Sequence, residues 1–238
     1  MARQRHLSHA PLREALIDIQ VPAILQSSLI DSLESLNIEQ FQKKVPIKIS
    51  EFAFQIDQDN SQANSKIQTI GWRLESQDGT RVIQLRTNGI TYSVINRYND
   101  WNDIKSATQE IWQKYCALVE GDIMVSRIAV RYTNVLEIPP GVELNDYLTT
   151  VPAIPQELPQ VFSSLFTRVI IPFAPNIQAQ ITTALESTNS IVLDSDVFSQ
   201  QSFDGKSLEL WAALDSLRDI KNSIFFSTVT EKAIRIYE

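Results

Sequence analysis

The sequence predicts an α+β protein of two similar units, in which antiparallel sheets pack on long helices. Segments of alternating apolar and polar residues indicate strands, and stretches with apolar residues three or four positions apart indicate helices. The expected elements follow nearly the same order twice, β-α-β-β-β-β-α in residues 1–120 and β-α-β-β-β-α in residues 121–238. We therefore expect two units that together form one continuous saddle-like sheet. The alternative is one irregular α+β domain without duplication.

The first unit opens with a strand over residues 14–21, where Ala15, Ile17 and Ile19 alternate with other side chains. Pro22 ends this strand and favours the start of an amphipathic helix that extends to about residue 37. Further strands are expected at residues 45–56, 65–76, 80–87 and 90–98, with a polar turn between the first two.

Turn and cap residues support this assignment. The dipeptides Asp78-Gly79 and Asn88-Gly89 are typical of tight β-hairpins. A long helix is expected from Trp101 to the region of Gly121, because its apolar residues form one stripe and a glycine follows it.

The second unit begins with a long strand over residues 122–138, which a Pro-Pro-Gly sequence ends. A short helix from Asp146 to Val151 and a proline-rich stretch follow. Three strands, at residues 161–173, 177–187 and 190–199, lead to a closing helix over residues 207–229. The apolar stripe of that helix contains Leu210, Leu214 and Leu217.

Composition limits the function classes. The chain has 21 basic and 28 acidic residues and a net charge of −7. An acidic surface argues against non-specific binding to nucleic acid or to anionic membranes, because both require an excess of lysine and arginine. The single cysteine, Cys116, excludes an intramolecular disulfide and indicates a reducing compartment. No apolar run is long enough to span a membrane and no secretory signal is visible, so a cytoplasmic location is expected.

Several motifs in order resemble a known family. They are HAPLREALIDIQV, GWRLESQDG, QLRTNGITYSVINRYNDW, SRIAVRYTNVLEIP, IVLDSDVF and KNSIFFSTVT. The chain looks like a member of a sporadically distributed bacterial family of about this length, whose members open with a Pro-Leu/Ile-x-Glu-Ala motif. That family is generally described as uncharacterised, so the resemblance implies no activity. Its patchy distribution implies accessory genes, including defence and toxin–antitoxin systems.

No coherent catalytic set is visible. His6 and His9 are the only histidines, and one cysteine cannot complete a zinc site with them. A nucleophilic triad lacks a well-placed base, and neither a Walker A nor a GxGxxG motif occurs. We therefore predict no catalytic residues, no metal site and no cofactor.

The strand SRIAVRYTN places Arg127 and Arg131 on one face and Asn134 on the other. If the first strands of the two units lie side by side at the centre of the sheet, Glu14 and Asp18 face these arginines. Carboxylate partners offset much of the cost of burying a guanidinium group. We therefore expect a salt-bridge ladder between the units, and the rival interpretation is a groove for an anionic ligand or acidic partner.

Two further pairs of residues complete the set of candidate binding residues. Asp194 and Asp196 share one strand face, and arginine pairing is a better explanation for them than magnesium binding. Lys221 and Asn222 are interpreted as the C-terminal cap of the last helix. The candidate ligand- or partner-binding residues are Arg127, Arg131, Asn134, Asp194, Asp196, Lys221 and Asn222.

The favoured functional hypothesis is a non-enzymatic interaction module of an accessory bacterial system. It would bind a partner protein (another chain or a second copy), a peptide or, less favoured because of the net charge, nucleic acid. The alternative is an enzyme or sensor that binds a phosphorylated or nucleotide ligand through Arg127, Arg131 and acidic residues. The two hypotheses differ in whether the arginines have internal carboxylate partners or face an open pocket.

Overall fold

The computed structural model describes residues 1–22, 27–57, 60–139, 141–159 and 162–238. Within these residues the main feature is one nine-stranded antiparallel sheet. In spatial order its strands are β2 (Phe41–Asp57), β3 (Asn60–Ser76), β4 (Arg81–Arg86), β5 (Gly89–Ile95), β1 (Leu12–Gln20), β7 (Arg127–Glu137), β10 (Ser190–Ser199), β9 (Ile177–Ser187) and β8 (Phe166–Ala174).

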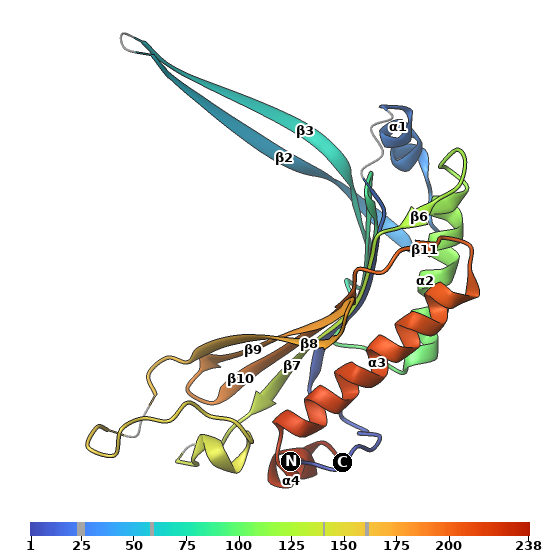
Figure 1. The fold of residues 1–238 in the computed structure, drawn as a ribbon. Coiled ribbons are helices and arrows are strands. Elements are labelled where there is room, and N and C mark those ends of the chain that lie inside the picture. Colours follow the sequence, from blue (N-terminus) through green and yellow to red (C-terminus); the bar gives the residue numbers. More distant parts are fainter. Residues whose placement is uncertain (23–26, 58–59, 140, 160–161) are drawn as a thin grey trace.

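Two long helices, α2 (Trp101–Cys116) and α3 (Leu208–Thr228), pack on the same face of this sheet. Both ends of the sheet curve away from these helices, so the opposite face is concave, and none of the described helices lies on it (Figure 1). We call it the open face. The α+β class and the packing of an antiparallel sheet on long helices are thus confirmed.

Smaller elements complete the chain. They are α1 (Ser27–Ser35), α4 (Glu231–Ile234), the 3₁₀ turns η1 (Leu144–Asp146) and η2 (Arg235–Tyr237), and the two-stranded pair of β6 (Met124–Val125) with β11 (Phe203–Asp204).

The centre of the sheet is the antiparallel pair β1 and β7, which joins residues from the two halves of the chain. Ile17 lies opposite Val130, and Asp18 lies opposite Ala129. Within the nine-stranded sheet, β1 and β7 are central, β5 and β10 lie beside them, and the strands that precede β5 and β10 in the sequence follow outward. The predicted central position of the two first strands is therefore confirmed.

The core lies between the sheet and the helices. Side chains that alternate along β1 and β7, such as Ile17, Ile19, Ile128 and Val130, are fully buried on the helix side. Asp100 caps the N-terminus of α2, because its carboxylate accepts hydrogen bonds from the N–H groups of Asn102 and Asp103. The period of the apolar residues thus determines which face of each element is buried.

The sequence-based expectations differ from the structure around β2 and β3. In place of a polar turn, the two strands stay paired out to Asp57 and Asn60. β4 pairs with β3 only from Gly71 to Glu75, so the rest of this hairpin extends as a two-stranded arm (Figure 1). Backbone pairing tolerates the serine and glutamine residues that indicated a loop.

One helix prediction lies partly outside the described residues, and another needs correction. The first helix was expected from about residue 22, but α1 covers Ser27–Ser35, and residues 23–26 lie outside the described residues. The helix expected from Asp146 to Val151 is wrong: only η1 forms. The following residues run beside the end of α3, where Leu148 bridges Val229 and the Thr149 N–H donates to Thr228.

The predicted turn at Asn88-Gly89 gives a test of this packing. Gly89 has a φ of +127°, and a Cβ atom there would lie 2.0 Å from the Ile19 carbonyl oxygen. Gly89→Ala is therefore expected to lower the free energy of unfolding by about 2–3 kcal/mol, through strain and a backbone clash. Urea denaturation measures this, with Gly79→Ala as the control. Gly79 also has a positive φ but open space around it, so an equal loss in both variants would contradict the close approach of β1.

Candidate functional site: two faces of the central strands

Asp18 is the hub of an ion-pair network on the open face. Its carboxylate lies 2.7 Å from the Arg86 guanidinium and 3.0 Å from that of Arg127. The Thr91 hydroxyl and the Gln20 amide donate to the same carboxylate, at 2.6 and 2.7 Å. This carboxylate is thus contacted by side chains from four strands, β4, β5, β1 and β7.

The second part of the network joins β7 to β10. Arg131 binds Asp194 with two hydrogen bonds of 2.8 Å, which is the bidentate geometry of a strong pair. Arg127 also reaches Asp196 at 3.3 Å. The predicted pairing of the two aspartates with arginines across the sheet is confirmed.

The pKa values of these groups follow from their surroundings. Hydrogen bonds to Asp194 raise the pKa of Arg131. Burial raises the pKa of Asp196 and outweighs the opposing effect of Arg127. Both arginines of the central strand β7, Arg127 and Arg131, thus have carboxylate partners.

One part of the ladder differs from the prediction. Asp18 faces Arg127 as expected, but Glu14 forms no ion pair with Arg131 in the described part of the chain. Arg131 turns toward β10 and uses Asp194 instead. Glu14 on β1 and Asp194 on β10 both lie opposite Thr133, so both are diagonal to Arg131, and its guanidinium binds the carboxylate on β10.

The seven candidate residues separate into two groups on opposite faces of the sheet. Arg127, Arg131, Asp194 and Asp196 belong to the open face, whereas Asn134, Lys221 and Asn222 lie on the helix side. This second group lines a pocket of about 840 Å³, together with the N-terminal segment and the loop before α2.

Lys221 is not a helix cap, which corrects the prediction. It lies within α3, which continues to Thr228, and its side chain is only 6% exposed. Its Nζ atom lies 3.5 Å from the centre of the Tyr132 ring and donates to the Asn222 side-chain oxygen at 2.5 Å. Burial lowers the pKa of Lys221 to about 7, and the nearby Arg218 contributes in the same direction.

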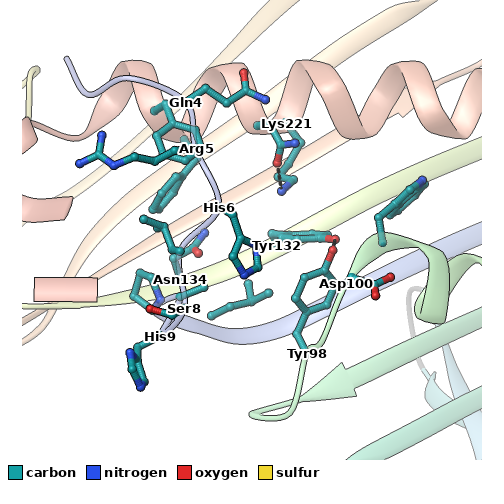
Figure 2. A pocket seen from close by; sticks show the side chains of 18 of the residues that line it. Gln4, Arg5, His6, Ser8, His9, Tyr98, Asp100, Tyr132, Asn134 and Lys221 are labelled. Atoms are coloured by element: carbon teal, nitrogen blue, oxygen red, sulfur yellow. Dashed lines mark hydrogen bonds between the residues drawn. The ribbon is translucent and has the colours of Figure 1, made fainter. Parts of the chain in front are cut away.

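The sequence did not indicate that the other residues of this pocket lie together. Figure 2 shows His6, Tyr98, Tyr132 and Lys221 around one hollow. The Tyr132 hydroxyl donates to the Tyr98 hydroxyl at 2.7 Å, and burial raises the pKa of both tyrosines. One signal was available: Lys221 continues the apolar stripe of Leu210, Leu214 and Leu217 at helical spacing.

A second surface feature is strand β8, at the end of the sheet. One of its edges pairs with β9, and no strand of the sheet pairs with the other within the described residues. Phe166, Ile170 and Val169 are 64%, 59% and 51% exposed, and Ile171 and Phe173 are also exposed. Register places Ile170 on the open face and Val169 on the helix-side face, so β8 exposes apolar side chains on both faces.

Comparison with known proteins gives no assignment, because no family model and no curated protein matches the chain. Among the described residues, no group of three or more histidine, cysteine or acidic side chains is arranged to hold a metal ion. None of the described helices is both long and apolar enough to cross a membrane.

Proposed function

We propose that this protein is a non-enzymatic interaction module that binds an extended segment of a partner protein along strand β8. An unpaired strand edge presents a row of backbone N–H and C=O groups that another strand can bond. The observation that carries the proposal is the exposure of five large apolar side chains on this one nine-residue strand.

Natural edge strands are usually shortened, charged or covered, since bare edges promote association. In β8 the one charged side chain is Arg168, and Pro172 is the one residue that cannot donate a backbone hydrogen bond. The other residues are suited to a partner strand, whose side chains would cover Ile170 on one face and Val169 on the other.

The open face supports the same class of function. Its central arginines are already neutralised by Asp18, Asp194 and Asp196. An anionic ligand would have to displace these carboxylates, which disfavours the alternative of a phosphorylated or nucleotide ligand at Arg127 and Arg131. Nucleic acid is disfavoured too, because it requires a continuous basic surface.

We also infer that the two halves are structural repeats with a boundary near residue 120. The same order of strands on both sides of the β1–β7 pair supports this inference. The family resemblance supports a role in an accessory bacterial system, and the composition supports a cytoplasmic location.

A charged double variant of β8 tests the docking proposal. Val169→Lys/Ile171→Lys places two cations on the helix-side face of the strand, at positions that are already exposed. We expect co-purification of the partner from the native cells to fall at least tenfold, as measured by quantitative mass spectrometry against the wild type. If the partner is a second copy, light scattering should instead show loss of the oligomer.

The control variant is Ile67→Lys/Met124→Lys, which changes two apolar residues that are exposed elsewhere. It should leave co-purification and oligomeric state unchanged. If the β8 variant keeps both the co-purified proteins and the oligomeric state of the wild type, the proposal is wrong.

A further inference from the structure

The pocket on the helix side is separate from β8 and from the open face. Its walls are the N-terminal segment, α3 and the end of β7 (Figure 2). Hydrogen bonds hold the N-terminal segment over it: the Ala2 N–H donates to Phe226 at 2.9 Å, and the His9 N–H donates to Tyr237 at 3.1 Å. The N-terminal segment is thus held in place as one wall of the pocket.

Lys221 is the least compensated charge that lines this cavity. A buried cation is normally paired with a carboxylate, because its desolvation is costly. In the part of the chain that the structure describes, however, Lys221 forms no ion pair, and its Nζ atom has only an amide oxygen and an aromatic ring as partners. An ammonium group has three donors, so donors remain for a ligand.

The tyrosine pair supplies another donor. Tyr98 and Tyr132 have two hydroxyl hydrogens, and their mutual hydrogen bond uses one. The rings meet edge to face, with centres 5.3 Å apart. The remaining hydroxyl hydrogen is available to an acceptor that enters beside Lys221.

The other charged groups around the pocket leave this cation uncompensated. Arg5 is held by Glu231 and Glu238. Asp100 accepts hydrogen bonds from the first turn of α2. Arg218 pairs with Asp219, and the side chains of His6 and His9 also line the pocket.

We propose that this pocket binds a small organic anion, whose carboxylate or phosphate group accepts hydrogen bonds from Lys221 and the tyrosine pair. The apolar part of the ligand would pack against Trp101 and Phe225, which also line the cavity. Cavities of this size that combine apolar walls with a few convergent polar groups are the usual form of small-molecule sites.

Calorimetry with three aromatic probes tests this proposal. Benzoate and its neutral analogue benzamide differ in charge at nearly the same shape, and phenyl phosphate tests a phosphate in place of a carboxylate. We expect at least one anion to bind at pH 6 at least tenfold more tightly than benzamide. Lys221→Met should weaken that binding at least tenfold, and Lys206→Met, an exposed lysine elsewhere, should not.

The pH dependence separates Lys221 from the two pocket histidines, His6 and His9. Benzoate affinity should fall between pH 6 and pH 9, as Lys221 loses its proton, and the fall should persist in the double variant His6→Gln/His9→Gln. The preferred anion then distinguishes a carboxylate from a phosphate ligand. If neither anion binds the wild type, or if Lys221→Met binds them equally well, the proposal is overturned.

Discussion

Lys221→Met is expected to stabilise the protein. The amine is buried on α3 and forms no ion pair with a carboxylate among the described residues, and methionine keeps the length and flexibility of the side chain without its charge. Each unit of pKa shift corresponds to about 1.4 kcal/mol, so the lowered pKa of Lys221 indicates a substantial penalty. After the loss of the contact with the Tyr132 ring, we expect a net gain of about 2–4 kcal/mol in the free energy of unfolding at pH 6.

The direction in which stability changes with pH follows from the number of protons that residue 221 binds in the folded and the unfolded chain. Below pH 7 lysine is protonated in both the folded and the unfolded chain, so the burial penalty is fully present. Between about pH 7 and pH 10.5 the unfolded state binds more protons at this site, so the site makes the wild type more stable as the pH rises. The advantage of Lys221→Met should therefore be largest below pH 7 and shrink toward pH 10.5.

Urea denaturation of the wild type and the variant at pH 6 and pH 9 measures this difference. Lys206→Met, at an exposed position, is the control and should change stability by less than about 0.5 kcal/mol at either pH. A Lys221→Met protein that is less stable than the wild type at pH 6 would show that the ammonium group is well compensated, contrary to the structure.

Asp18→Asn, in contrast, is expected to lower the free energy of unfolding strongly. This nearly isosteric change removes the charge that Arg86 and Arg127 share in the centre of the sheet, where Asp18 is 7% exposed. It leaves Arg86 without its carboxylate partner and Arg127 with only the longer contact to Asp196. Loss of one member of a buried ion pair costs about 3–5 kcal/mol, and we expect a destabilisation of this size.

The matched control is Asp146→Asn, which removes the exposed ion pair with Lys232. Exposed pairs contribute about 0–1 kcal/mol, so this change should be nearly neutral. Equal unfolding midpoints for the two variants would mean that the open-face network contributes no more than a surface pair.

Sequence periodicity predicted most of the fold because burial follows the pleat of a strand and the turn of a helix. It placed Arg127 and Arg131 on the face opposite Ile128 and Val130, and the arginine–aspartate pairing followed from the cost of burying charge. Strands were predicted at residues 45–56 and 65–76, but the continued pairing of Asp57 and residues 60–64 was missed, because the polar residues there resemble a loop.

The helix-side pocket could not be predicted from one sequence. His6 reaches it only through the docking of the N-terminal segment on the C-terminal region, contacts that connect opposite ends of the chain. The Lys221 side chain was assigned to the C-terminal cap of the last helix, although it continues the buried stripe of Leu210, Leu214 and Leu217. Likewise, an apolar strand such as β8 is normally assigned to a core, and only the strand order places it at an edge.

Hydrogen–deuterium exchange on β8 tests the central proposal of a docking edge most directly. In the free protein, the N–H groups of residues 166–174 that do not bond to β9 should exchange rapidly. In the complex with the co-purified partner, or at concentrations where the protein self-associates, these groups should become protected while the exposed part of the β2–β3 arm stays unchanged. Unaltered exchange along β8, with protection at another surface, would contradict the proposal.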